Sequence, residues 1–235
     1  QALSRLGRYT IDYTNMRNVE VKLDTEDFYN NLDEYLRITS FVKLASEPLL
    51  APIKNVQIVD GHIYVLDRMN RLVCYDMQGK VLFDIDAMGN GPGEYAEIST
   101  FTVDTGKNEL VLYDNSKTSL FFYTLNEGFY KRTERFMKPN PSEMVFHNGA
   151  FFFNNRHHKN YPNDSLLHYS LLVFTDFKIM NGYCFPHNDD EENYIFSPSL
   201  QTFNMNGDIL YYCKNFDSKI YNVNKDSVIC CYNIH

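Results

Sequence analysis

The sequence predicts an all-β fold, a β-propeller of four-stranded antiparallel blades, from three observations. Aromatic residues make up 15% of the 235 residues, and they are Tyr and Phe, 18 of each, with no Trp. These side chains suit the half-buried surface of a pleated sheet. Short apolar runs separated by Asn, Asp and Gly turns follow residue 36, a pattern that is typical of strands joined by hairpins. Similar units then recur along the chain.

The recurring units predict the blades. Equivalent strands, which we expect to be the inner strands, begin near residues 62, 109, 150 and 208, at intervals of about 47, 41 and 58 residues. Four short strands fit in a unit of this length, as they do in a propeller blade. One blade cannot bury both of its faces, so the blades must stack around an axis. We expect residues 1–35 to form an N-terminal extension and residues 36–235 to form the propeller domain.

Charge and cysteine content exclude several classes of protein. The formal net charge is −8, and no basic stripe is present, which argues against a nucleic-acid partner and against a polybasic membrane patch. Five cysteines at irregular spacing form neither a disulfide framework nor a zinc motif, so we expect free thiols, mostly buried. No run of 18 apolar residues is present, so no membrane span is expected. The start at Gln1 leaves a removed export signal open.

A distinctive motif lies at residues 89–95, Gly-Asn-Gly-Pro-Gly-Glu-Tyr, between an Asp-Met-Gln-Gly-Lys turn and an apolar strand at 98–103. With its lead-in at 41–44, 49–53 and 63–67, this succession resembles the six-bladed β-propeller family of Bacteroidetes lipoproteins, which is NHL-like in architecture. The resemblance is good over residues 36–136 and weaker to 235. It implies an exported, periplasmic or cell-surface protein with a lipid anchor on an N-terminal cysteine that this chain does not include.

The family resemblance carries no catalytic residues, because the family's biochemical function is largely uncharacterised. It also implies six blades, whereas the repeat indicates about four. We therefore expect the chain to be a fragment of a six-bladed propeller, with a different closure of the ring as the alternative.

Three acidic residues are candidate ligand-binding groups. Asp67 and Asp114 occupy equivalent places at the ends of repeated strands, so they should lie at the same end of the axis, where propellers often bind ligands. Repetition also fits a structural role, in which each carboxylate caps a turn. Glu94, in the glycine-rich loop, could face a ligand or bind backbone amides. That loop lacks the Lys-Ser/Thr of a phosphate-binding loop.

The polar segment 154–161 is the best candidate for a ligand-binding loop, and Arg156, His157 and His158 are its candidate residues. The alternative is a solvated loop, since adjacent histidines on a strand diverge. No cofactor is expected. The acidic run at 189–192 leaves calcium open, although its spacing does not match that of an EF-hand.

No Ser-His-Asp set, nucleophile elbow or HExxH motif is present. We therefore predict a non-enzymatic cell-envelope propeller that binds a glycan, peptide or protein partner. Two alternatives remain at this point. One is a propeller hydrolase or lyase with a metal in the central channel, held by carboxylate or histidine ligands, with His157, His158, Asp67 and Asp114 as the first candidates. The other is a pure scaffold that binds nothing small.

Overall fold

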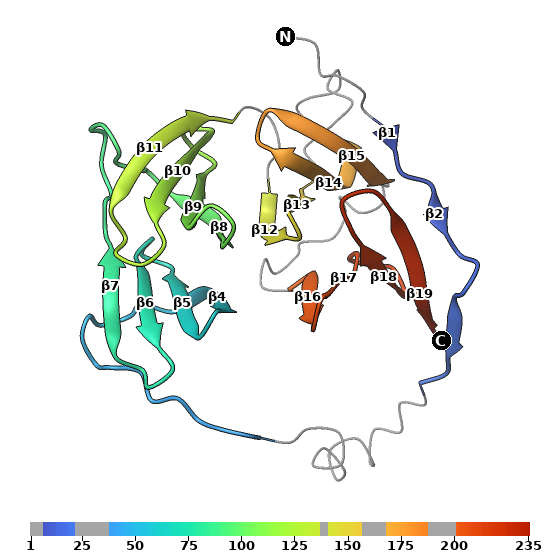
Figure 1. The fold of residues 1–235 in the computed structure, drawn as a ribbon, viewed down its shortest axis with the longest axis horizontal. Helices are drawn as coiled ribbons and strands as arrows, with labels where there is room; N and C mark the ends of the chain where they lie inside the picture. Colours follow the sequence, from blue (N-terminus) through green and yellow to red (C-terminus); the bar gives the residue numbers. More distant parts are fainter. Residues whose placement is uncertain (1–6, 22–37, 137–140, 157–167, 188–200) are drawn as a thin grey trace.

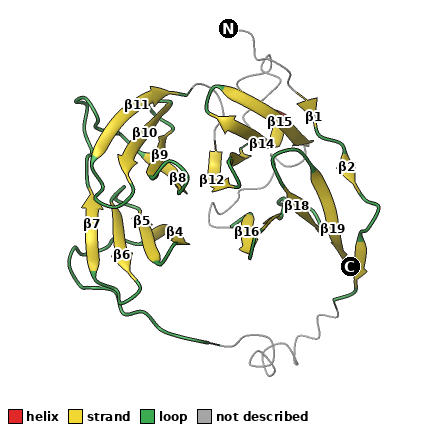
Figure 2. Cartoon of the chain, in the orientation of Figure 1, coloured by secondary structure: helices red, strands yellow, loops and turns green. Residues whose placement is uncertain are grey.

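The computed structural model describes residues 7–21, 38–136, 141–156, 168–187 and 201–235. These residues form β-strands and turns and contain no α-helix. Four antiparallel sheets follow one another around a common centre (Figure 1, Figure 2), so the prediction of an all-β propeller is confirmed. The described residues include no helix that is long and apolar enough to span a membrane.

Each sheet is a blade of four consecutive strands, ordered from the centre outwards. The first two blades are regular. Blade 1 contains β4 (Ile53–Val59), β5 (His62–Asp67), β6 (Leu72–Asp76) and β7 (Val81–Ile85). Blade 2 contains β8 (Ile98–Asp104), β9 (Glu109–Asp114), β10 (Ser119–Thr124) and β11 (Tyr130–Arg135).

The other two blades have the same order and gain additional strands at their outer edges. Blade 3 contains β12 (Pro141–His147), β13 (Ala150–Asn155), β14 (Tyr169–Asp176) and β15 (Ile179–Pro186). Blade 4 contains β16 (Phe203–Asn206), β17 (Ile209–Tyr212), β18 (Lys219–Val223) and β19 (Val228–Ile234).

The repeated strands were predicted at the right residues, but they are not the innermost strands of the blades. The strands expected near 62, 109, 150 and 208 are β5, β9, β13 and β17, and each is second from the centre. β9 and β13 are buried along their whole length, because neighbouring blades cover both of their faces. Such strands have continuous apolar sequences. The innermost strand β4 alternates exposed and half-buried residues beside the channel, so its sequence signal is weaker.

The N-terminal segment lies along the outer edges of the last two blades. β1 (Gly7–Arg8) pairs in parallel with β15, and β2 (Ile11–Asp12) and β3 (Arg17–Val19) pair in parallel with β19. These pairings cover backbone groups that an outer strand would otherwise expose. Part of the expected extension, residues 1–35, therefore belongs to two of the sheets.

Three hydrophobic layers join neighbouring blades, and a smaller one covers the free face of blade 1. That face carries Val65 and Tyr75, and Leu44 and Leu50 from the preceding segment pack against its cluster. The backbone N–H of Ala45 donates to the carbonyl oxygen of Gly79 at 2.8 Å. Gly79 has φ +80°, and a Cβ there would lie 2.0 Å from the Lys43 carbonyl oxygen, so this contact requires glycine.

The thiols follow the prediction. All five cysteines are free, and Cys74, Cys184 and Cys230 are buried. Cys213 and Cys231 are partly exposed, so only one of the adjacent residues 230 and 231 belongs to the core, as expected for neighbours on a strand.

Candidate functional site

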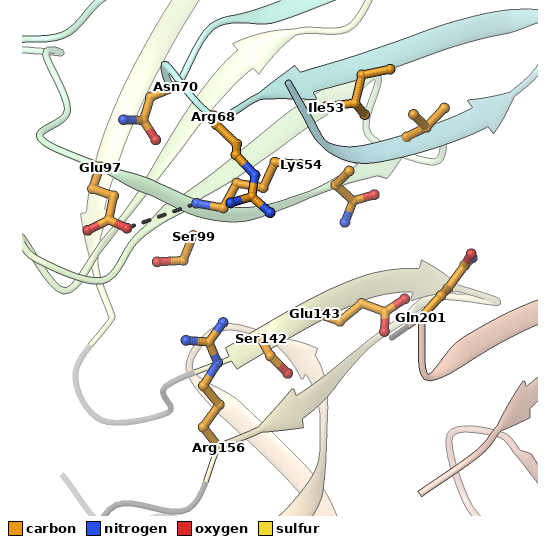
Figure 3. Close-up of a pocket in the computed structure, with 12 residues that line it drawn as sticks. Ile53, Lys54, Arg68, Asn70, Glu97, Ser99, Ser142, Glu143, Arg156 and Gln201 are labelled. Carbon is orange, nitrogen blue, oxygen red and sulfur yellow. Dashed lines mark ion pairs between the residues drawn. The ribbon is translucent and has the colours of Figure 1, made fainter. Parts of the chain in front are cut away.

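A cavity of about 710 Å³ opens at one end of the propeller axis, where the innermost strands begin (Figure 3). All four blades contribute to its lining, from Ile53 of β4 to Gln201 just before β16. Ten of the twelve described lining residues are polar or charged, so the cavity suits a polar ligand rather than a hydrocarbon one. We call this cavity the channel mouth.

Three cationic side chains extend into the channel mouth: Lys54, Arg68 and Arg156 (Figure 3). The Lys54 Nζ donates to the Ile98 carbonyl oxygen at 2.6 Å and lies 4.0 Å from Glu97 Oε1. Desolvation lowers the pKa of Lys54, the positive charges of Arg156 and Arg68 lower it further, and Glu97 acts in the opposite direction. Both arginines are therefore close enough to Lys54 for their charges to act on it.

The two arginines of the channel mouth have no side-chain partner among the described residues. Neither the Arg156 nor the Arg68 guanidinium makes a hydrogen bond or ion pair with another described residue. Desolvation lowers the pKa of Arg156, and the negative charge of Glu97 partly offsets this effect. Both arginines are exposed, so their guanidinium N–H groups are accessible and can form charge-assisted hydrogen bonds with an anion that enters the cavity.

Of the two carboxylates in the channel mouth, Glu143 is engaged elsewhere. Its Oε2 accepts hydrogen bonds from the Thr202 N–H at 2.7 Å, the Thr202 hydroxyl at 2.6 Å and the Phe203 N–H at 3.4 Å. Burial raises the pKa of Glu143, and these hydrogen bonds oppose the shift in part. Glu143 thus links blade 3 to the start of blade 4, and the mouth retains an excess of positive charge.

The neutral side chains of the channel mouth are amides and hydroxyls. Asn70 and Ser142 are used internally: Asn70 Oδ1 accepts from the Ile98 N–H at 3.1 Å, and the Ser142 hydroxyl donates to the Asn154 carbonyl oxygen at 3.1 Å. Asn55, Ser99 and Gln201 make no side-chain hydrogen bond with another described residue. They are free to bind a ligand.

Asp67 and Asp114 lie at the same end of the axis as the channel mouth, as predicted, but behind its surface. Both are buried, at 2% and 0% exposed. Asp67 accepts from the backbone N–H groups of Ala51, Met69 and Arg71 at 2.9–3.1 Å. Asp114 accepts from those of Ala96, Glu97 and Lys117 at 2.6–3.2 Å. These carboxylates fix the turns that carry Arg68 and Glu97, which agrees with the turn-capping interpretation.

Glu94 lies inside its own loop and is not part of the channel mouth. Its Oε2 accepts from the Gly91 N–H at 2.7 Å, and the Lys117 Nζ donates to the carbonyl oxygens of Gly89 and Glu94 at 2.8 and 2.7 Å. A Cβ on Gly89 would lie 2.0 Å from the Glu94 carboxylate. The glycine at 89 therefore makes room for this side chain, and the described contacts of Glu94 are structural.

Of the predicted loop 154–161, the structure describes residues 154–156. Arg156 lines the channel mouth, whereas His157, His158 and the acidic run at 189–192 lie outside the described residues. Within the parts of the chain that are described, no three His, Cys, Asp or Glu side chains come together as a metal site would require.

Sequence reasoning found Arg156 but missed Lys54, Arg68 and Glu97. Lys54 is a single lysine in an alternating strand, which is ordinarily a solvated position. Arg68 directly follows Asp67, and Glu97 gives its backbone N–H to Asp114. Its position next to the repeated Asp67 was therefore a sequence signal for Arg68, whereas no local pattern marks Lys54 or Glu97.

A family model described as a 6-bladed beta-propeller matches residues 12–235. The chain belongs to this six-bladed β-propeller family. The match covers nearly the whole chain, including Asp12 of β2 and all of β3 in the N-terminal segment. Four blades lie within the described residues.

Solved structures show the same fold. A Bacteroides fragilis protein that is thought to be exported is 20% identical, with a TM-score of 0.70 over 83% of this chain and 55% of that one. A Bacteroides vulgatus protein is 10% identical, with a TM-score of 0.52 over 83% and 61%. The WD40 repeats of RRP9 are 12% identical, with a TM-score of 0.52 over 81% and 53%. The chain thus spans between about half and three-fifths of these proteins. No curated protein sequence matches it.

Proposed function

We propose that the protein is a non-enzymatic propeller that binds a glycan, peptide or protein partner at the channel mouth. The observation that carries this proposal is the set of unengaged polar side chains around one cavity at the end of the axis. Asn55, Ser99 and Gln201 come from three blades or their connections, and Arg68 and Arg156 add charge. Side chains on rigid strands and short capped turns are already placed for binding, which lowers the entropic cost of complex formation.

We also propose that the protein is exported and lipid-anchored in the cell envelope. The family resemblance supports this location, and the Bacteroides fragilis protein with the same fold is thought to be exported. The location makes extracellular or periplasmic glycans and peptides the relevant ligands. The proposed location does not depend on which residues of the protein bind the ligand.

A blocking substitution tests the binding site. Ser99 lines the channel mouth and makes no side-chain hydrogen bond with a described residue, so Ser99→Trp should place an indole in the cavity without breaking such a bond. We expect this variant to lose at least about tenfold in affinity for the partner, because the indole occupies its place. The measurement is binding to a panel of glycans and peptides, followed by titration of each hit.

The matched control is Thr105→Trp, in the exposed β8–β9 turn at the other end of the blade. It should bind as the unmodified protein does, and both variants should unfold at similar temperatures. Equal binding by the two tryptophan variants would place the binding surface outside the channel mouth. A panel without any ligand that distinguishes them would also contradict the proposal.

A further inference from the structure

The charge of the channel mouth is opposite to the charge of the whole chain. The protein carries a net charge of −8, yet the described lining holds three cations and two carboxylates. One of these carboxylates, Glu143, is 9% exposed and occupied by Thr202 and Phe203. The other, Glu97, is 56% exposed and lies 4.0 Å from Lys54. Among the residues that the structure describes, none places a counter-charge in direct contact with the Arg68 or Arg156 guanidinium.

Carboxylate and sulfate groups match this arrangement. A guanidinium presents a planar set of N–H donors that binds two oxygens of one anion, and such charge-assisted bonds are short and strong. In Figure 3, Arg156 extends from blade 3 towards the region between Lys54 and Ser99, while Arg68 approaches the same region from blade 1. An anionic group placed there would face cations from both sides.

The neutral groups around the cations indicate the rest of the ligand. The amides of Asn55 and Gln201 and the hydroxyl of Ser99 can each donate and accept hydrogen bonds. Sugar hydroxyl groups have the same double capacity. The two apolar lining residues, Ile53 and Val56, are 52% and 40% exposed, so the described lining offers little enclosed apolar surface to a peptide side chain. This composition favours a glycan over a peptide.

We propose that the channel mouth binds an anionic oligosaccharide, with Arg68 and Arg156 contacting its charged groups and the neighbouring amides and hydroxyls contacting its hydroxyl groups. This inference rests on the proposed function and names the ligand class for the same site. The Lys54 Nζ already donates a hydrogen bond to the Ile98 carbonyl oxygen, so Lys54 contributes its positive charge rather than a direct contact with the ligand. Glu97 weakens the field and limits the affinity for anions.

The test compares four probes by titration calorimetry at low and high salt: tetragalacturonate, its neutral galactose counterpart, a sulfated galactan tetrasaccharide and tetraglutamate. We expect a carboxylated or sulfated saccharide to bind about tenfold or more tightly than the neutral one, and to weaken as salt screens the charges. The anion that binds more tightly identifies the source of the charge. Tetraglutamate should bind at least about tenfold more weakly than the better anionic saccharide, because it lacks the sugar hydroxyl groups.

Variants separate a ligand contact from a structural effect. Arg156→Gln and Arg68→Gln should each weaken binding of the anionic saccharide about tenfold and leave the neutral one unchanged. Glu97→Gln should strengthen anion binding severalfold, since it removes the opposing charge. The control is Arg135→Gln on the exposed outer strand β11, which changes the net charge equally and should have no effect.

Three results would overturn the inference. They are equal affinity for the anionic and neutral saccharides, an Arg156→Gln variant that behaves like Arg135→Gln, and tetraglutamate binding as tightly as the saccharides. In each of these cases the Ser99→Trp substitution decides what remains. If it abolishes binding of a neutral glycan or a peptide, the proposed function stands and only the ligand class is wrong. If Ser99→Trp has no effect on any ligand, both proposals fail.

Discussion

Replacing Phe153 with alanine should lower the free energy of unfolding by about 3–5 kcal/mol. Phe153 is fully buried in the layer between blades 2 and 3. Its ring centroid lies 5.5 Å from that of Phe136 and 5.2 Å from that of Phe174, in the edge-on or tilted geometry that aromatic pairs prefer. Alanine would leave a cavity that these rigid neighbours cannot close. Denaturant unfolding, followed by fluorescence or circular dichroism, measures the change.

Phe129→Ala is the matched control for Phe153→Ala. Phe129 is 67% exposed, so the same change of side chain should cost well under about 1 kcal/mol. If the two variants lose similar amounts of stability, Phe153 is not tightly packed in the aromatic layer between blades 2 and 3.

Glu143→Ala should lower the free energy of unfolding by about 2–4 kcal/mol, since it leaves buried backbone donors without an acceptor. The Glu143 carboxylate binds the N–H groups of Thr202 and Phe203 and the Thr202 hydroxyl. Thr202 and Phe203 are both 2% exposed, so water cannot easily replace the carboxylate. Glu127→Ala, at an exposed turn, is the control and should be nearly neutral. A neutral Glu143→Ala would show that blade 4 is attached by other contacts.

The contribution of Glu143 to stability should depend on pH. Burial raises the pKa of Glu143 in the folded protein, so the folded state favours the protonated form more than the unfolded chain does. The contribution of this group to stability is therefore fully present at acid pH and falls as the pH rises from the ordinary glutamate pKa through the raised one. Glu143→Gln does not titrate, so the advantage of the unmodified protein over this variant should shrink over the same interval.

The strands that sequence reasoning located best are those buried on both faces. β5, β9, β13 and β17 have continuous apolar runs, so their repeat gave the propeller and the approximate blade count. The innermost strands were not recognised as such, because a strand facing the channel alternates and resembles any half-exposed strand. The parallel pairing of residues 7–19 with β15 and β19 was also missed, since it depends on backbone contacts between distant segments.

The candidate site was only partly predictable for a similar reason. Asp67 and Asp114 were found through their repetition, which placed them correctly at the end of the axis, beneath the site. Lys54 and Arg156 are far apart in the sequence and line the same cavity only because the blades are arranged around one axis. No local pattern marks such a pair. Repetition identifies the parts that hold a propeller site in place, whereas its binding groups differ from blade to blade.

Competitive labelling of lysines tests most directly whether the channel mouth is the binding site. An amine-acylating reagent with mass spectrometry would compare Lys54, in the mouth, with Lys107, in the turn at the other end of blade 2. Desolvation lowers the pKa of Lys54 and increases the share of its reactive amine near neutral pH. At a ligand concentration ten times Kd, binding should slow labelling of Lys54 by about tenfold and leave Lys107 unchanged. Unchanged labelling of Lys54 under saturating ligand would contradict the account.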